Sequence, residues 1–299
     1  MRQHNRQNWK ELVRLAAEDR IKGAIEIARD AAEAFALAES QNAEPGEILN
    51  AVTNFVTRQS AMAPVLRLSA EIKNAIDTGS LKLVTKVAIE WLEKLSDSLH
   101  RFEVELIKSF ELSVYKPWVF HSSSSTVSEG IKALAAERSI IGDAYVSESS
   151  PGSEGVNTAA LLSEIGWETV LMPDSVVFDK ILNNDIEVVI LGCDAFDDKM
   201  FVNKSGSGAI ASLASSQQIP VELWATTHKI LPSNVLGHLD FSQQGNVEYP
   251  GFDGQVEQPL FGFGNMKHVS LIRTETGVMK TDDIKMFMNK LPDIPSGLI

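Results

Sequence analysis

The stretch EVVILGCDAFDDKMFVNKSGSGAIASLA, residues 187–214, decides the fold of the C-terminal part of the chain. It begins with a short apolar run, typical of a buried strand, and ends, after a turn that contains Gly206 and Gly208, in a pattern typical of a helix. Strands that alternate with helices in this way form largely parallel sheets. Such sheets bind ligands beyond the carboxyl ends of their strands, and Asp194 stands at that point here.

The same alternation extends over the rest of the C-terminal half. Helices fill most of the intervals between further predicted strands, at residues 117–120, 144–148, 168–172, 220–225 and 268–274. The segment from about Pro232 to Met266 is rich in Gly, Gln, Asn and Phe and has no clear periodicity. We therefore predict a lid or an interface element there.

Residues before about 112 follow a helical pattern instead. Apolar residues recur at helical spacing from Trp9 to about Ala38, resume after Pro45, and form a long stripe from Leu81 to Phe110. We predict an α/β protein in which an N-terminal helical domain, residues 1–112, precedes a Rossmann-like, mainly parallel α/β sheet domain, residues 113–299.

The composition argues against several classes of function. The net charge is −13 and no block of Lys and Arg offers a surface to phosphates, so we expect no direct nucleic-acid binding. The single cysteine, Cys193, rules out an internal disulfide, and the histidines show no metal-ligand spacing, so no metal site is predicted. Without a signal-peptide pattern or an apolar run of the ~20 residues that cross a bilayer, the chain is expected to be cytoplasmic, with no membrane partner.

Asp194 is the strongest chemical candidate. A carboxylate that leaves an apolar strand is partly desolvated, which raises its pKa toward the range useful for proton transfer, although a cap or a structural salt bridge would use the same residue. Lys204 and the glycines after it could supply charge and backbone donors to a phosphate, but their spacing is not that of a P-loop or a dinucleotide fingerprint. The serines at 122–125 could hold an anion at a helix N-terminus or simply cap that helix.

Several segments, in order along the chain, resemble the motifs of one family. In the first half, DRIKGAIEIARDAAEAF resembles an Arg-Gly-Ala helix entry and TRQSAMAPVLRL an Arg-Pro-Thr/Ser segment. In the second half, VFHSSSSTV resembles a segment that carries a catalytic cysteine, YVSESSPGSEG a Glu-Ser-Arg-Pro segment, ILGCDAF a Gly-Ala-Asp strand end, VNKSGS an Asn-Lys-Ile-Gly-Thr turn and LIRTETGV a Thr-Glu-x-Gly terminus. These are motifs of the alpha, beta and delta subunits of eukaryotic translation initiation factor 2B and of methylthioribose-1-phosphate and ribose-1,5-bisphosphate isomerases.

The resemblance implies a set of site residues. It places Asp194 and Ser122 at the two catalytic positions, and it assigns substrate and phosphate contacts to Lys22, Gly23, Ala24, Arg58, Ser123, Ser124, Glu148, Asn203 and Lys204. The chain departs from the isomerases at Ser122, which replaces the catalytic cysteine and is a far weaker acid. It also departs at Ser150 and Val156, which replace arginines able to bind a phosphate through two parallel hydrogen bonds.

Two functions follow from the resemblance. The first is a translation initiation factor 2B subunit-like protein that binds a sugar phosphate or related phosphometabolite in a cleft between the two domains, without normal isomerase chemistry. The alternative is an aldose–ketose isomerase for a phosphorylated pentose of the ribose-1,5-bisphosphate or methylthioribose-1-phosphate type, with Cys193 or Ser122 in place of the missing thiol. A scaffold with a vestigial pocket is a third possibility. The resemblance also implies a homodimer or higher oligomer, with translation factors among the candidate partners, and no cofactor.

Overall fold

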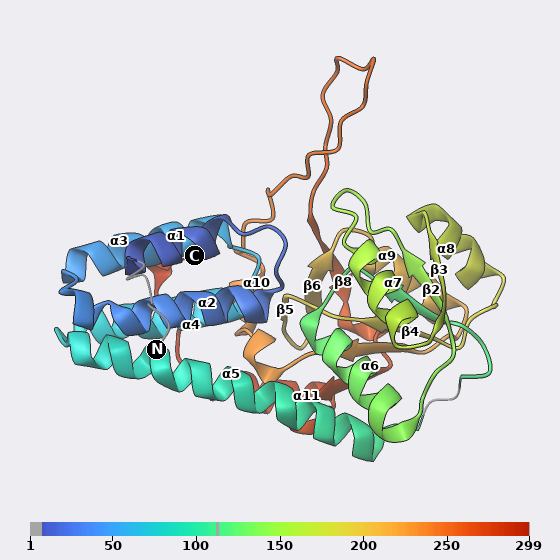
Figure 1. Cartoon of the computed structure of the whole chain (residues 1–299), viewed down its shortest axis with the longest axis horizontal. Helices are drawn as coiled ribbons and strands as arrows, with labels where there is room; N and C mark the ends of the chain where they lie inside the picture. The colour runs from blue at the N-terminus through green and yellow to red at the C-terminus, as the bar shows by residue number, and fades with distance from the viewer. Residues whose placement is uncertain (1–7, 112–113, 299) are drawn as a thin grey trace. The chain divides into compact units, whose positions relative to one another are not determined.

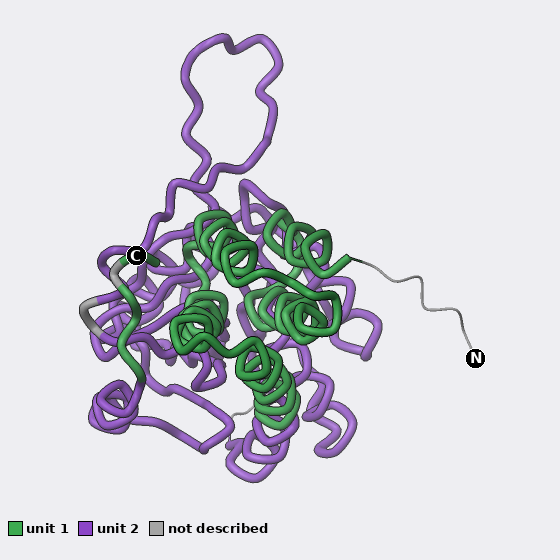
Figure 2. The backbone as a smooth tube through the Cα atoms, turned by 90° about the vertical axis from the view of Figure 1, so that its left-hand side faces the viewer, with its two compact units in different colours: residues 1–98, 292–299 green, residues 99–291 purple. Residues whose placement is uncertain are grey.

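The computed structural model describes residues 8–111 and 114–298 and divides the chain into two compact units (Figures 1 and 2). Unit 1 comprises Met1–Ser98 with Pro292–Ile299, and unit 2 comprises Leu99–Leu291. The chain passes from unit 1 to unit 2 within helix α5, Leu81–Ser109. The domain boundary predicted at residues 112 and 113 lies outside the described residues and stays a prediction.

Unit 1 is helical, as the apolar periodicity predicts. Its elements are α1 (Trp9–Glu18), α2 (Ala24–Leu37), the 3-10 turn η1 (Glu39–Gln41), α3 (Pro45–Arg58), α4 (Ala63–Asp77), the first part of α5, and η4 (Ser296–Leu298). Pro45 begins α3, where its fixed φ and missing N–H suit the first helical position. Gly79 follows the end of α4 with a φ of 78°, a conformation that favours glycine.

Large aromatic side chains fill the interior of unit 1. Trp9, Phe35, Phe55 and Trp91, from four different helices, are each at most 2% exposed. The rings of Trp9 and Phe35 lie 6.3 Å apart, a contact worth ~0.5–1.5 kcal/mol beyond the area it buries. The apolar stripes read from the sequence therefore face one common core.

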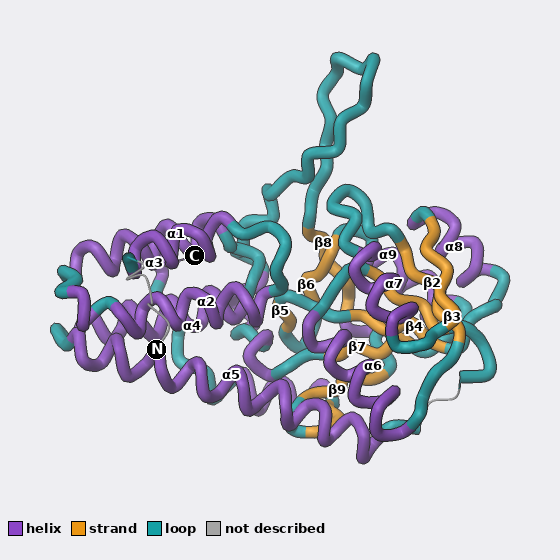
Figure 3. The backbone as a smooth tube through the Cα atoms, viewed as in Figure 1, coloured by secondary structure: helices purple, strands orange, loops and turns teal. Residues whose placement is uncertain are grey.

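Unit 2 is built on a mainly parallel sheet (Figure 3). Within the described residues its seven strands run in the order β10-β9-β7-β4-β1-β2-β3, and neighbouring strands are parallel except β9 and β10. The strands are β1 (Trp118–His121), β2 (Asp143–Ser147), β3 (Glu168–Met172), β4 (Val188–Leu191), β7 (Val221–Trp224), β9 (Leu271–Thr274) and β10 (Gly277–Met279). All the strands predicted from the sequence are present with small shifts at their ends, which confirms the α/β fold; β10 was not predicted.

Two cores cover the two faces of this sheet. Alternate residues of a strand point to opposite faces, so Val119 packs into one core while its neighbours Trp118 and Phe120 pack into the other. The helices of unit 2 are α6 (Ser125–Arg138), α7 (Gly155–Glu164), α8 (Asp174–Leu182), α9 (Ser207–Ser216), α10 (Ser233–Leu236) and α11 (Thr281–Met288), with 3-10 turns η2 (Thr227–Lys229) and η3 (Met266–His268). Residues of α8, α9 and α11 join the first core, and residues of α5, α6 and α7 join the second.

A second, antiparallel sheet was not predicted. It consists of β5 (Ala195–Phe196), β6 (Met200–Lys204) and β8 (Phe261–Asn265), in the order β5-β6-β8. Helix α9 approaches β8 closely, because a Cβ on Gly208 would lie 1.9 Å from the carbonyl oxygen of Phe263. The sheet places Lys204, at the end of β6, beside the strand ends of the main sheet.

The segment predicted as a lid or interface element contains α10, strand β8 and a long arm between them. Figure 1 shows this arm, residues 239–260, projecting from the rest of unit 2. Near its base the Gln258 side chain donates to the carbonyl of Val247 at 2.5 Å and accepts from its N–H at 2.8 Å. Farther along, Tyr249 and Phe252 are 51% and 57% exposed.

Among the described residues, no helix combines the length and the apolar character needed to cross a bilayer.

Candidate functional site

Asp194 leaves the carboxyl end of β4 and lies between the two sheets of unit 2. Its backbone N–H donates to the carbonyl of Val202 at 2.8 Å, which ties it to β6. Burial raises the pKa of Asp194 to about 6; Lys229 and Lys204 act to lower it and Glu154 acts to raise it. A carboxyl group with a pKa near 6 can both accept and donate a proton near neutral pH. The raised pKa expected from the sequence is therefore present.

Lys204 is a buried cation with a fixed partner. Its side chain is 3% exposed, and its ammonium lies 2.9 Å from both carboxylate oxygens of Glu154. The turn that follows is held by Ser207, which accepts a hydrogen bond from the Asn203 side chain at 2.9 Å and donates to the carbonyl of Lys204 at 2.7 Å. Gly206 makes this turn possible with a φ of 97°. Asn203 therefore shapes the turn that carries Lys204.

Ser122 follows β1 and joins a chain of hydrogen bonds. Its φ is 68°, and its N–H donates to the hydroxyl of Ser149 at 2.7 Å. The Ser149 and Ser147 hydroxyls lie 3.0 Å apart, and the Ser147 hydroxyl lies 2.5 Å from Nδ1 of His121. Because Nε2 of His121 lies 2.9 Å from the carbonyl of Ser205, which can only accept, Nε2 carries the proton and Nδ1 accepts from Ser147. Sequence reasoning missed His121, although it directly precedes Ser122.

His121 connects Ser122 to the charges around Lys204. Burial lowers the pKa of His121, while the nearby Asp174 and Glu154 charges act to raise it and Lys204 acts to lower it. Asp174 in turn accepts from the N–H groups of Ser149 and Ser150 at 2.8 and 3.0 Å. Neutral His121 is thus a fixed hydrogen-bonding group rather than a free base.

The remaining predicted residues of unit 2 have different surroundings. Ser123 is partly exposed, and Ser124 precedes the first turn of α6. Gly192 allows Ser124 to approach β4, because a Cβ on Gly192 would lie 2.5 Å from that of Ser124. The Ser124 hydroxyl is buried and has no hydrogen-bond partner within the described residues. Glu148 is partly exposed, and its N–H donates to the carbonyl of Met172 at 2.8 Å.

Lys229 is a candidate site residue that sequence reasoning missed. It is 3% exposed, ends turn η2, and precedes Ile230, which pairs with Phe196 two residues beyond Asp194. In residues 8–111 and 114–298 its ammonium makes no hydrogen bond or ion pair, and the strongest charge acting on Asp194 is that of Lys229. The only sequence signal was its position after a predicted strand end, beside His228.

The predicted residues of unit 1 lie at the ends of its helices. Lys22 pairs with Asp30, Gly23 precedes α2 and donates its N–H to Glu26 at 3.2 Å, and Ala24 begins that helix, buried. Arg58 ends α3, and its guanidinium lies 3.6 Å from Glu18. Burial and the charge of Arg58 lower the pKa of Arg20, a second arginine in this region that the sequence reading overlooked.

The TRQSAM segment after α3 also has a structural role. Gln59 is 1% exposed, and its amide donates to the carbonyls of Ala16, Ala17 and Asp19 at 3.2, 3.1 and 2.7 Å. These carbonyls lie at the end of α1, where a helix leaves its last acceptors unsatisfied. Gln59 therefore caps α1 and fixes the backbone next to Arg58.

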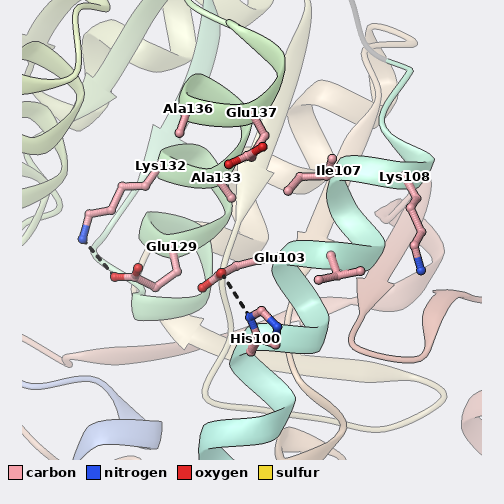
Figure 4. A pocket seen from close by; sticks show the side chains of 10 residues that line it. His100, Glu103, Ile107, Lys108, Glu129, Lys132, Ala133, Ala136 and Glu137 are labelled. Atoms are coloured by element: carbon pink, nitrogen blue, oxygen red, sulfur yellow. Dashed lines mark hydrogen bonds and ion pairs between the residues drawn. The ribbon is translucent and has the colours of Figure 1, made fainter.

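A separate groove lies between α5 and α6 (Figure 4). Its volume is about 630 Å³, and it is lined by His100, Glu103, Val104, Ile107, Lys108, Glu129, Lys132, Ala133, Ala136 and Glu137. Burial and the charge of Glu129 raise the pKa of Glu103. None of the predicted site residues lines this groove.

The two remaining kinds of chemistry to consider are a reactive thiol at Cys193 and a metal site. Cys193 is 1% exposed, and burial raises the pKa of its thiol to about 12, so it stays protonated at neutral pH. Among the described residues, no group of three or more His, Cys, Asp or Glu side chains is arranged to hold a metal ion.

Comparison with known proteins agrees with this architecture. The structure of a Pyrococcus horikoshii translation initiation factor eIF-2B superposes with a TM-score of 0.79 at 25% identity, covering 93% of this chain and 99% of that one. A 5-methylthioribose 1-phosphate isomerase from the same organism gives a TM-score of 0.69 at 17% identity over 95% and 87% of the two chains, which shows a shared fold.

The sequence relatives differ in how much of the chain they match. An eIF-2B subunit 2-like protein of Pyrococcus horikoshii is 28% identical over 280 residues, 90% of this chain and 95% of that protein. A ribose 1,5-bisphosphate isomerase of Methanocaldococcus jannaschii is 28% identical over 142 residues, so the match spans about half of each protein: 45% of this chain and 46% of the isomerase. The sequence model of the initiation factor 2 subunit family, IF-2B, matches residues 20–281. The chain therefore belongs to the initiation factor 2 subunit family.

Proposed function

We propose that this chain is a translation initiation factor 2B subunit-like protein that binds a sugar phosphate or a related phosphorylated metabolite at the strand ends around Asp194, without normal isomerase chemistry. The observation that carries the proposal is the pair of buried cations near this carboxylate, Lys204 and Lys229, in a chain whose net charge is −13. Burying an ammonium group costs free energy; Glu154 offsets that cost for Lys204, and an anionic ligand would offset it for Lys229.

The other groups at the strand ends suit a phosphorylated sugar. The serines before α6 offer hydroxyls beside a helix N-terminus, whose first turn presents backbone N–H groups and binds anions favourably. Asn203 and the turn after Lys204 bring further polar groups to the same edge. Asp194, with a pKa of about 6, can donate to or accept from a sugar hydroxyl.

The proposal excludes normal isomerase chemistry because the second proton carrier is missing. Ser122 carries a hydroxyl where the isomerases that the chain resembles carry a thiol, and a hydroxyl is a far weaker acid. Cys193 cannot replace that thiol, since it is buried and its pKa is about 12. His121 cannot replace it either, because both of its ring nitrogens are engaged in hydrogen bonds.

A thermal-shift screen tests the proposal directly. Ribose-1,5-bisphosphate, methylthioribose-1-phosphate, ribose 5-phosphate and nucleoside monophosphates are each added to the purified protein, and at least one phosphorylated sugar is expected to raise the Tm through preferential binding to the folded state. The same sugars without phosphate are the matched controls. A Tm that no compound changes would support a scaffold with a vestigial pocket instead.

The second candidate function is an aldose–ketose isomerase acting on a phosphorylated pentose. The pKa of Asp194 favours it, because a group that titrates near 6 is suited to general acid–base catalysis. The assay follows ketose formation from ribose-1,5-bisphosphate and from methylthioribose-1-phosphate. Turnover that is lost in Asp194→Asn would replace the binding proposal with this one, whereas binding without turnover supports the first function.

We further propose that the protein self-associates through unit 2 and acts in the cytoplasm with translation factors as partners. The exposed Tyr249 and Phe252 on the arm support an interface there, because aromatic side chains with this much exposed surface are enriched where proteins meet. Light scattering is expected to give a dimer or larger mass, and Tyr249→Ser with Phe252→Ser is expected to reduce it. A monomer in the unsubstituted protein would contradict the proposed assembly.

A further inference from the structure

The position of Lys229 depends on the short turn that carries it. Its ammonium has no hydrogen bond or ion pair in the described part of the chain, so no side-chain partner fixes it. A lysine side chain has a flexible stem of four carbons and loses ~2 kcal/mol of conformational entropy when held in one arrangement. What places the ammonium near Asp194 is therefore the backbone of turn η2.

Neighbouring segments hold this turn at both ends. Upstream, the N–H of Ala225 donates to the carbonyl of Arg273 in β9 at 3.0 Å. Downstream, Ile230 pairs with Phe196, and the N–H of Leu231 donates to the carbonyl of Phe196 at 3.0 Å. Within the turn, the N–H groups of Lys229 and Ile230 donate to the carbonyls of Thr226 and Thr227 at 3.0 and 3.1 Å. The N–H of Thr227, the first residue of the turn, has no acceptor within so short a helix.

Glu275 supplies that acceptor. It lies between β9 and β10, is 5% exposed, and accepts from the N–H of Thr227 at 2.9 and 3.2 Å through its two carboxylate oxygens. The Thr227 hydroxyl also donates to the same carboxylate. Burial raises the pKa of Glu275, while the bonds from Thr227 and the charge of Arg101 act to lower it. The buried carboxylate of Glu275 thus accepts hydrogen bonds from both the backbone and the side chain of Thr227.

We propose that Glu275 is a positioning residue, which clamps the Thr227–Lys229 turn through Thr227 and thereby holds the Lys229 ammonium beside Asp194. Lys204 and Glu154 form an ion pair and act on the pKa of Asp194 in opposite directions, whereas Lys229 has no such partner within the described residues and lowers that pKa most. Cys193, also next to Asp194, is uncharged. Through this clamp, a residue that directly follows the carboxyl end of β9 affects the ionisation of Asp194.

The experiment follows the ionisation of Asp194 in the free protein. Aspartate-labelled protein is titrated by ¹³C NMR, and the Asp194 carboxyl signal is assigned by its loss in Asp194→Asn. Glu275→Gln keeps the shape of the side chain but weakens the clamp, and Thr227→Val removes only the hydroxyl. Glu275→Gln is expected to raise the pKa of Asp194 by about one unit, since a nearby cation lowers a carboxylate pKa by ~1–3 units and the freed ammonium no longer does so. Thr227→Val should give a smaller rise, because the backbone N–H of Thr227 still donates to Glu275.

Two further variants separate positioning from other effects. Thr227→Ser keeps the hydroxyl and should restore the original titration. In Lys229→Met the pKa of Asp194 is already raised, and adding Glu275→Gln should raise it no further, because coupled residues are not additive. The inference would be overturned if Glu275→Gln left the titration of the otherwise unsubstituted protein unchanged, or if Glu275→Gln still shifted it in Lys229→Met, which would mean that Glu275 acts by its own charge.

The inference concerns the site of the proposed function, but its test uses no ligand. If no sugar phosphate binds and the titrations behave as expected, the clamp stands and the proposed function fails. If a sugar phosphate binds and Glu275→Gln lowers only the Tm, Glu275 is a structural cap of η2 and the clamp is wrong.

Discussion

The raised pKa of Asp194 makes the stability of the folded protein depend on pH. Its pKa of about 6 exceeds the ~3.9 of an aspartate in an unfolded chain, so the folded protein binds this proton more tightly. Between pH ~4 and ~6 the folded state therefore holds more protons than the unfolded state, and stability falls as the pH rises through this window. Above it the loss is complete. A carboxylate in this position therefore lowers the stability of the folded protein at neutral pH, and carboxylates with strongly shifted pKa values cluster at functional sites.

Asp194→Asn should consequently stabilise the protein at neutral pH. The amide imitates the uncharged acid, so we expect a gain of about 1–3 kcal/mol in the free energy of unfolding at pH 7.5 and little change near pH 4. Urea denaturation at both pH values measures it, with Asp253→Asn on the exposed arm as control. An equal effect of Asp194→Asn at the two pH values would show that the charge is not responsible.

The two positions that could carry a reactive thiol should behave in opposite ways. Cys193 is buried with a pKa of about 12, so we expect its reaction with a disulfide reagent at pH 8 to require unfolding. In the double variant Ser122→Cys with Cys193→Ser, the new thiol occupies a partly exposed position just before α6 and should react in the folded protein. Rapid labelling of Cys193 in the native chain would contradict this account of its burial.

At the scale of elements, helix α9 packs so closely on β8 that position 208 has room only for glycine. A Cβ on Gly208 would lie 1.9 Å from a backbone oxygen of Phe263, which cannot move without disturbing β8. Gly208→Ala should therefore cost about 1–3 kcal/mol or more, the usual range for overpacking, although alanine normally favours a helix. Thermal or urea unfolding measures the loss.

Gly46 provides the matched control. It is also the second residue of a helix, α3, but nothing lies within 4 Å of a Cβ added there. Gly46→Ala should be neutral or stabilising by up to ~1 kcal/mol. If the two substitutions had the same effect, the contact between α9 and β8 would not be as close as described.

The parallel strands were predictable and the second sheet was not, for physical reasons. Strands such as β4 are buried on both faces and read as continuous apolar runs, which identifies them without knowledge of their partners. Strand β5 is two residues long, and β6 pairs with β8, which lies beyond the arm, so no local pattern marks them. No strand was therefore predicted between Asp194 and the turn that contains Gly206.

Some candidate site residues could be chosen from the sequence for the same reason. Asp194 follows a strand and Lys204 ends one, and both were selected as candidates by that position. Lys229 was missed because its importance comes from burial and from the nearness of Asp194, neither of which its neighbours in the sequence reveal. His121 was missed although it directly follows the strand predicted at residues 117–120, because its contacts with Ser147 and Ser205 come from distant segments.

For the whole molecule, the similarity to a relative named for the initiation factor extends over more of the chain than the similarity to an isomerase. The Pyrococcus relative named eIF-2B subunit 2-like matches 90% of the chain, whereas the Methanocaldococcus isomerase matches 45%. With a net charge of −13, the protein repels anions at long range, so any phosphate must be held by local cations. Lys204 and Lys229 are the candidates for these cations.

Isothermal titration of a phosphorylated sugar into the protein and two lysine variants is the most direct test of this account. With the compound that gives the largest thermal shift, the unsubstituted protein and Lys199→Met, an exposed control, should bind alike, and Lys204→Met should bind at least ~10-fold more weakly, as expected for the loss of a charge-assisted hydrogen bond. Equal affinity in Lys204→Met, or no binding to the unsubstituted protein, would contradict it.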